Sequence, residues 1–276
     1  MKRRCKRIGS LLLALCMVMA MLPAPAFAAA GDTFTDSGMK YEVLTEDSGA
    51  GTVALTGYEG SGPSGSLTVA DAVYSGGITY TVTEIGDSAF KFCGELTGVT
   101  IPDSVEAIGD EAFMFCEKLA SLSLGSSVKT IGESAFEFCG RLESVYIPAS
   151  VEAIGNEAFA QCGSLTAFTV APGNPDFSAE GGVLYDKSGK PLLIYPPGKT
   201  DASFSIPASV ETIGIYAFNQ CDNLESVTIG GSVENIMENA FTNCENLESV
   251  TIGSPVKTIG KEAFYDCGSL ETVAFE

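Results

Sequence analysis

The stretch from Val105 to Leu124 reads Val-Glu-Ala-Ile-Gly-Asp-Glu-Ala-Phe-Met-Phe-Cys-Glu-Lys-Leu-Ala-Ser-Leu-Ser-Leu, and variants of it follow one another along the chain. Its core, Ile-Gly-x-x-Ala-Phe-x-x-Cys, returns every 23 residues, the separation of Phe90 from Phe113. The repeated phenylalanines are Phe90, Phe113, Phe136, Phe159, Phe218, Phe241 and Phe264. A fixed period of this length is typical of a solenoid, whose units stack along one elongated core. Such a shape favours recognition over catalysis.

The two halves of the repeated unit have different hydrophobic periods. Ala112, Phe113 and Cys116 have helical spacing, which predicts a short helix or turn with Asp110 as its N-cap. The pattern Leu-x-x-Leu-x-Leu from Leu119 to Leu124 predicts a short strand. We therefore predict an α/β repeat solenoid: a right-handed superhelix with a parallel sheet on one face and short helices or turns on the other.

The strand pattern resembles the leucine-rich repeat, and the whole unit resembles the BspA-type bacterial leucine-rich repeat family. The segments that carry the resemblance are Ile101-Pro-Asp-Ser-Val-Glu-Ala-Ile-Gly-Asp-Glu-Ala-Phe113 and Ile206-Pro-Ala-Ser-Val-Glu-Thr-Ile-Gly214, within residues 77 to 276. The resemblance implies a curved solenoid on a secreted or cell-surface protein. It also implies an adhesin-like role in contact with a host or microbial extracellular partner.

Residues 1–28 have the features of a secretory signal peptide. Basic residues lie between Lys2 and Arg7, an apolar run extends from Leu11 to Leu22, and small residues lead up to Ala28. The apolar run is shorter than the ~20 residues that span a bilayer, which makes a retained membrane anchor the weaker alternative. We expect cleavage after Ala28 or one to two residues later, and a secreted or surface-associated protein with no transmembrane segment afterwards.

Two further regions follow the signal segment. Residues 31–81 do not show the repeat and alternate β-forming residues with Gly and Ser, which predicts a small β-rich cap over the open first face of the solenoid. Residues 82–276 hold seven 23-residue repeats. The chain stops at Glu276, at the end of an expected strand. Either the protein associates with itself through this uncapped end, or the sequence is a fragment of a longer protein.

The net charge of the chain excludes polyanionic partners such as nucleic acid. The formal net charge is −20, and the signal segment holds five of the 15 basic residues and none of the 35 acidic ones, so the mature chain carries 10 − 35 = −25. A polyanion of this size repels nucleic acid and anionic lipid. The acidic residues form either a face for a basic partner or a solvated coat that keeps the solenoid soluble.

The array is interrupted between Phe159 and Phe218, which are 59 residues apart, or 36 more than one period. The excess lies at about 171–206. Within it, Gly182 to Tyr185 and Pro191 to Tyr195 flank a turn, which predicts a β-hairpin. The insertion is either a structural variant of the repeat or a projecting ridge that contacts a partner.

Six side chains are candidates for partner binding. Five lie in the insertion, and the sixth is the one aromatic residue expected on the outward face of the sheet, which otherwise carries small and hydroxylated residues. The candidates are Tyr146, Tyr185, Lys187, Lys190, Tyr195 and Lys199.

Seven cysteines follow the signal segment, each three residues after a repeated phenylalanine. They are Cys93, Cys116, Cys139, Cys162, Cys221, Cys244 and Cys267. Stacked coils would bring them close enough for disulfides, which are common in exported proteins. However, seven is odd, equivalent side chains in stacked coils point in parallel, and no Cys or His spacing fits zinc. With the phenylalanines they are better interpreted as a structural ladder of buried free thiols.

Catalysis and cofactor binding receive no support from the sequence. The chain has no histidine, which excludes Ser-His-Asp, Cys-His and histidine-metal chemistry. No phosphate-binding or calcium-binding loop is present, and the acidic residues recur at equivalent positions as a solvated face does. We therefore expect a non-catalytic protein without cofactor or metal that binds an extracellular protein or glycan. The alternative is a structural spacer in a larger surface protein.

Overall fold

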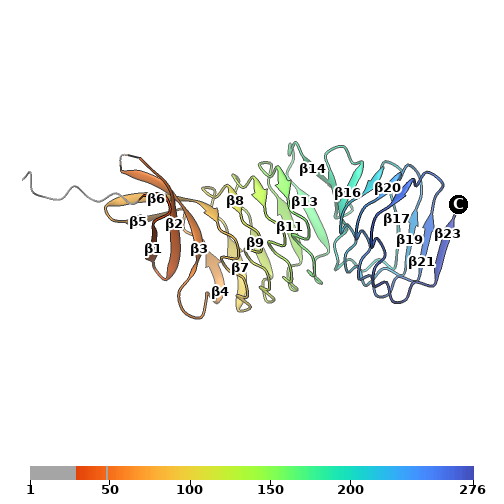
Figure 1. Ribbon diagram of the computed structural model, residues 1–276, viewed down its shortest axis with the longest axis horizontal. Coiled ribbons are helices and arrows are strands. Elements are labelled where there is room, and N and C mark those ends of the chain that lie inside the picture. The colour runs from red at the N-terminus through yellow and green to blue at the C-terminus, as the bar shows by residue number, and fades with distance from the viewer. Residues whose placement is uncertain (1–28, 48) are drawn as a thin grey trace, which may run out of the picture.

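The computed structural model describes residues 29–47 and 49–276, which form an elongated stack of coils behind an N-terminal cap (Figure 1). The expected signal peptide, residues 1–28, lies outside the described residues. The described residues contain no helix, and hence none long and apolar enough to cross a membrane.

The N-terminal cap is a mixed β-sheet whose strands continue into the solenoid. Antiparallel pairing joins β1, β2 and β3, whereas β3 pairs in parallel with β6. Tyr58 at the end of β3 stacks on Phe90 of the first coil, with ring centroids 6.2 Å apart. The cap thus extends the aromatic core of the repeats. Its strands are β1 (Thr33–Asp36), β2 (Met39–Asp47), β3 (Ala50–Tyr58), β5 (Ala72–Ser75) and β6 (Ile78–Ile85). The remaining strand of this region, β4 (Gly65–Thr68), pairs in parallel with residues 96–100 of the first coil instead.

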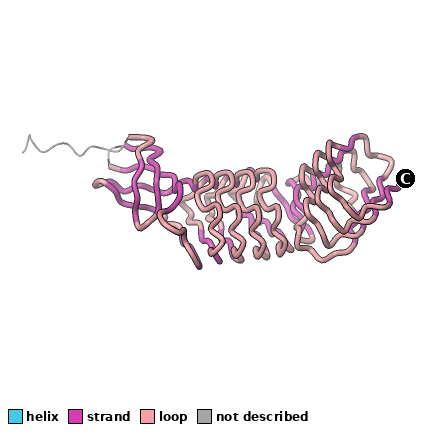
Figure 2. The backbone as a smooth tube through the Cα atoms, turned by 60° about the horizontal axis from the view of Figure 1, so that its bottom comes forward, coloured by secondary structure: helices cyan, strands magenta, loops and turns pink. Residues whose placement is uncertain are grey.

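Each coil contributes one strand to each of two parallel ladders (Figure 2). The first ladder consists of two-residue strands at the start of the unit, in register at 23-residue steps, as in Ile108 beside Ile131. They are β8 (Ala107–Ile108), β10 (Thr130–Ile131), β12 (Ala153–Ile154), β18 (Thr212–Ile213), β20 (Asn235–Ile236) and β22 (Thr258–Ile259).

The second ladder is the parallel arrangement expected from the leucine pattern, although the strands are shorter than the pattern suggested. Its inward side chains, such as Val145 and Ile147, are buried, and the residues between them are exposed. The strands are β7 (Leu96–Thr100), β9 (Ser121–Ser123), β11 (Ser144–Ile147), β13 (Ala167–Val170), β17 (Ser203–Ser205), β19 (Ser226–Ile229), β21 (Ser249–Ile252) and β23 (Thr272–Phe275).

The prediction of short helices was wrong, because the Ala-Phe-x-x-Cys segments are turns. Glu111 and Phe115, on either side of Phe113, both adopt left-handed conformations, with φ of 55° and 61°. The Phe113 N–H donates to the carbonyl of Ala135 in the next coil at 2.8 Å, as a strand would, and not to its own segment. Asp110 is likewise no N-cap: its carboxylate accepts the Glu133 N–H of the next coil at 2.7 Å. The handedness of the superhelix stays a prediction.

The core is a ladder of stacked rings and thiols. Phe113, Phe136 and Phe159 are buried, with successive centroids 5.2 Å and 5.4 Å apart. Beside them, the Cys139 thiol donates to the carbonyl of Phe113 at 3.5 Å, and the other coils repeat this contact. We call this set the inner ladder.

The long gap in the array contains an additional, shorter coil. Tyr195 takes the place of the repeated phenylalanine: it stacks on Phe218 at 5.0 Å, and its carbonyl accepts the Cys221 thiol at 3.8 Å. The described residues thus form eight coils, of which seven carry the Ala-Phe-x-x-Cys motif and this one does not. The hairpin is present, but its second strand enters the first ladder by parallel pairing with β18. The inserted strands are β14 (Phe177–Glu180), β15 (Val183–Asp186) and β16 (Pro191–Ile194).

The insertion also divides the solenoid into two stacks, each with its own buried core. The first ladder of the N-terminal stack ends at β12. Its second ladder consists of two hydrogen-bonded groups, β4-β7-β9 and β11-β13, and ends at β13. New ladders begin with β14 and β17. The coils of the two stacks are visible as separate groups in Figure 2.

The cysteines of the inner ladder are expected to resist thiol reagents in the native protein. All seven are free and six are buried, Cys267 being partly exposed. Burial raises the pKa of Cys116 to about 12, so little reactive thiolate forms near neutral pH. Mass spectrometry after alkylation without reductant should find at most one modified cysteine in the native mature protein and seven after denaturation. Fewer than seven in the denatured protein would indicate disulfides and contradict the ladder.

Candidate functional site

Two of the predicted binding residues belong to the core. Tyr185 and Tyr195 are 5% and 1% exposed, so the prediction that they project on a ridge was wrong. Their rings replace apolar side chains in the second stack, and the Tyr195 hydroxyl donates to Asp201 at 3.1 Å. Burial raises the pKa of both hydroxyls, that of Tyr185 to about 12. Neither tyrosine is available to a partner.

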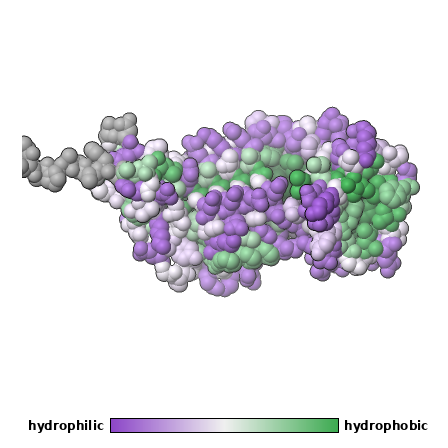
Figure 3. Space-filling model, viewed as in Figure 1, coloured by the Kyte–Doolittle hydropathy of each residue, from purple (hydrophilic) through white to green (hydrophobic). Residues whose placement is uncertain are grey.

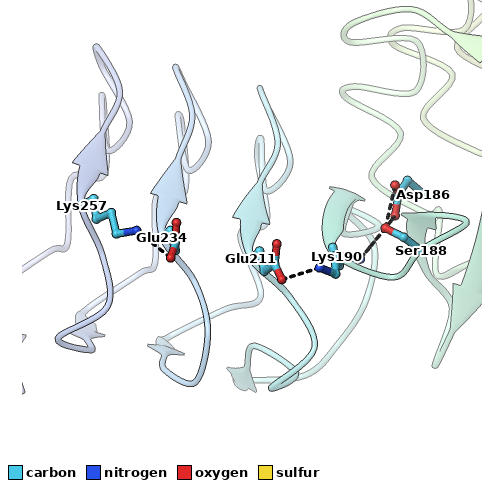
Figure 4. A network of polar contacts seen from close by, with 6 residues as sticks. All are labelled: Asp186, Ser188, Lys190, Glu211, Glu234 and Lys257. Atoms are coloured by element: carbon cyan, nitrogen blue, oxygen red, sulfur yellow. Dashed lines mark hydrogen bonds and ion pairs between the residues drawn. The ribbon is translucent and has the colours of Figure 1, made fainter.

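Two of the three lysines of the insertion form ion pairs, and Lys190 does so along the row of coils drawn in Figure 4. Lys190 pairs with Glu211 at 2.6 Å, and Lys257 and Glu234 repeat the pairing in later coils at 2.7 Å. Lys199 pairs with Asp201 at 3.2 Å. Lys187 is exposed in the hairpin turn. Exposed pairs of this kind contribute at most about 1 kcal/mol to the free energy of unfolding. The Lys190 and Lys257 pairs join neighbouring coils, so these lysines are already paired with carboxylates of the protein.

Tyr146 lies apart from the insertion, on β11 of the first stack. Its side chain is 53% exposed, and its partner in the adjacent strand is Thr169. Ser144 on the same strand and Thr169 beside it are small hydroxylated residues, as the sequence indicated. The structure therefore does not bring the six predicted residues together in one site, and Tyr146 stays a candidate by itself.

An exposed column of aromatic rings, which the sequence analysis missed, follows the turns of the first three coils. The rings of Phe92 and Phe115 stack with centroids 5.0 Å apart, and those of Phe115 and Phe138 with centroids 4.3 Å apart. Phe92 is 67% exposed, and the other two are partly exposed. We call Phe92, Phe115 and Phe138 the outer aromatic column.

Backbone geometry explains why these rings face outward. All three residues have left-handed φ angles, between 60° and 65°, which turn their side chains away from the inner ladder two residues before. Such φ angles are uncommon for bulky residues and are held here by bonds between coils: the Phe115 N–H donates to the Glu137 carbonyl at 2.9 Å. The column is therefore carried on a fixed backbone.

Charged groups border the column. The Lys91 ammonium lies 5.5 Å from the Phe92 ring centroid and 2.7 Å from the Glu111 carboxylate. Desolvation, followed by repulsion from Glu111, raises the pKa of Glu137. The column is thus an apolar strip edged by one cation and two carboxylates.

The column is limited to three coils. At the equivalent position, two residues after the repeated phenylalanine, the later coils carry Gln161, Gln220, Asn243 and Asp266. These residues keep the same left-handed conformation, so the fold does not require phenylalanine there. The signal in the sequence was the four-residue pattern Phe-x-Phe-Cys of the first three units. An interpretation of this segment as a helix does not distinguish the second phenylalanine from a core residue.

The remaining surface differs in hydropathy from one part of the protein to another. In Figure 3, apolar surface covers much of the C-terminal stack, where Val273 and Phe275 of the last strand are exposed, and polar side chains dominate the upper edge. Across residues 29–47 and 49–276, no cluster of three or more acidic or cysteine side chains is placed to hold a metal ion.

The family model described as BspA type leucine-rich repeat region matches the chain in six copies, over residues 75–179 and 200–276. The fold is similar to that of the pneumococcal vaccine antigen PcpA, with a TM-score of 0.61 and 23% identity over 90% of this chain and 82% of that one. A leucine-rich repeat protein from Eubacterium ventriosum gives a TM-score of 0.65 and 24% identity over 89% and 73%. A leucine-rich repeat protein from T. pallidum gives 0.50 and 25% over 87% and 91%. No curated protein matches the sequence.

Proposed function

Because the chain belongs to the BspA-type leucine-rich repeat family, we propose that it is a secreted or cell-surface protein that recognises an extracellular protein or glycan through its outer aromatic column. It performs no catalysis in this role. The signal-like sequence before Ala29 and the strongly acidic mature chain support export and solubility.

The observation that carries this proposal is the column itself. Stacked rings on a fixed backbone lose little conformational entropy on binding, and large aromatic side chains supply much of the energy of protein recognition. Their flat faces also suit the apolar faces of sugars. A spacer solenoid would need no such strip, since Gln161 and Gln220 satisfy the same backbone position elsewhere in the chain.

A binding screen with one variant tests the proposal. The mature protein, residues 29–276, is screened by surface plasmon resonance against extracellular-matrix proteins and glycans. The variant carries Phe92→Gln, Phe115→Gln and Phe138→Gln, the residue that coils four and six use. We expect at least about a tenfold loss of affinity, because three outward-facing rings are removed, while the free energy of unfolding falls by about 3 kcal/mol or less.

Matched glutamine exchanges provide the control. Gln161→Ala and Gln220→Ala alter the same backbone position outside the column and should leave affinity unchanged. Absence of saturable binding to any extracellular protein or glycan would favour the spacer alternative. Full binding by the triple variant would remove the column from the proposal.

A further inference from the structure

A cleft of about 330 Å³ opens where the two stacks meet. Register places Leu192 beside Ile213, and Tyr195 stacks on Phe218. Tyr195 follows Leu192 by three residues, whereas Phe218 follows Ile213 by five. The turn of the additional coil is thus two residues shorter than in a full repeat. It leaves residues 154–157 on the rim of the preceding coil partly exposed, and residues 154–160 form one wall of the cleft.

The opposite wall breaks the polar pattern of the repeats. Ile215 and Met237 line the cleft and are 39% and 38% exposed. The residues equivalent to Ile215 in the other full coils are Asp87, Asp110, Glu133, Asn156, Glu238 and Lys261. Those equivalent to Met237 are Gly86, Gly109, Gly132, Gly155, Gly214 and Gly260. Exposed apolar residues thus replace polar residues and glycine where the cleft lies.

One carboxylate in the cleft lacks a cation. Glu157 is half-buried and belongs to none of the ion pairs of the described residues, whereas its equivalent Glu111 pairs with Lys91 at 2.7 Å. Desolvation, with repulsion from Glu137, raises the pKa of Glu157. A carboxylate held this way gains free energy when a cation reaches it.

A buried amide beside this carboxylate is also incompletely bonded. Asn219 lines the cleft and is 6% exposed; its amide nitrogen lies 3.5 Å from the Glu157 carboxylate, the limit for a hydrogen bond. The oxygen of the same side-chain amide, Oδ1, has no hydrogen-bond partner in the described part of the chain. The Glu157 carboxylate and the Asn219 side-chain oxygen both accept hydrogen bonds, so this pair of groups matches a cationic donor.

We propose that the cleft binds a lysine or arginine side chain flanked by aliphatic residues in an extended segment of a protein partner. Glu157 pairs with the cation, and the walls of Ile215 and Met237 take the aliphatic neighbours. The volume lies at the lower end of the ~300–1,000 Å³ of ligand sites, enough for one or two side chains. This inference rests on the proposed function and names the chemistry of the partner.

Fluorescence anisotropy with short labelled peptides tests the cleft directly. The probe is an acetylated, amidated peptide with the central sequence Ser-Leu-Arg-Leu-Ser, and its partner peptide has citrulline in place of arginine. We expect saturable binding of the arginine peptide and a loss of about tenfold or more with citrulline or with Glu157→Gln, because each removes one charge of a partly buried pair. Ile215→Lys should abolish binding, since it places a cation beside Glu157.

The controls separate the cleft from the fold and from the aromatic column. Lys261 shows that a coil accepts lysine at the position of Ile215, and Glu111→Gln changes the equivalent carboxylate outside the cleft. Glu111→Gln and the triple phenylalanine variant should bind the peptide normally. Equal binding of the citrulline peptide, or unchanged binding by Glu157→Gln and Ile215→Lys, overturns the inference even if the screen finds a partner. Peptide binding at the cleft without any extracellular partner upholds the cleft and refutes the proposed function.

Discussion

Replacing Phe136 by alanine is expected to lower the free energy of unfolding by about 3–5 kcal/mol. The side chain is fully buried and stacks on Phe113 and Phe159 of the two adjoining coils. The cavity left by its removal would lie between two interfaces of the array. Because a solenoid is held together only by contacts between neighbours, the coils cannot collapse around the cavity without losing register.

Guanidinium denaturation followed by circular dichroism measures this loss. The control is Phe138→Ala in the same coil, which removes an identical side chain from the outer aromatic column. Its cost should be about 1 kcal/mol, since the ring is partly exposed and loses mainly its stacking contact. Similar costs for the two variants would mean that inner ladder and outer column are wrongly distinguished.

Gly132→Ala is expected to destabilise the protein by about 3 kcal/mol or more. A Cβ atom at this position would lie 2.5 Å from the carbonyl carbon of Gly109 and 2.6 Å from the backbone nitrogen of Asp110. Both atoms belong to the backbone of the preceding coil, so no side-chain rotation relieves the clash. The coils would have to move apart and weaken the ladder bond from the Gly132 N–H to the Ile108 carbonyl.

Gly140→Ala in the same coil is the matched control. A Cβ atom there meets nothing within 4 Å, and the residue is not among those with positive φ. The substitution should be neutral or stabilise by about 0.4–1 kcal/mol, because alanine restricts the unfolded chain. Thermal unfolding of the two variants measures the change in stability that each substitution causes. A loss at Gly140 as large as that at Gly132 would contradict close backbone packing at the Ile-Gly step.

The repeat predicted the solenoid, the parallel strands and the inner ladder, because those features depend on which residues face inward. It did not predict the turns. The spacing of Ala112, Phe113 and Cys116 fits a helix equally well, and what excludes a helix is the bonding of the Phe113 N–H to the next coil. That bond exists only when coils are stacked, so a single unit does not reveal it.

The additional coil was missed because its motif is incomplete. Tyr195 lies 23 residues before Phe218, which is one full period, but two residues are lost before it and no cysteine follows. The hairpin pattern was correctly recognised, whereas the burial of Tyr185 and Tyr195 was not. Burial depends on β16 entering the ladder beside β18, a pairing between segments that the local pattern does not specify.

The candidate sites could be predicted from the sequence only in part. Aligning the units shows Phe115 at a position that is polar in the later coils and Ile215 at one that is polar in the other full coils. Phe115 is partly exposed and Ile215 is exposed. The cleft beside Ile215, however, results from the shortened coil. It lies between residues 154–160 and 212–219, which are far apart in the sequence, so it is visible only in the structure. Departures from the repeat, more than the repeat itself, mark the surfaces proposed to bind partners.

Hydroxyl-radical footprinting of the mature protein, free and bound to the partner found in the screen, tests the recognition surface most directly. Radicals oxidise exposed aromatic side chains, and mass spectrometry locates the products. Oxidation of Phe92 and Phe115 should fall in the complex, while that of Tyr146 on the strand side stays the same. Protection of Tyr146 with unchanged oxidation of Phe92 and Phe115 would contradict recognition through the outer aromatic column.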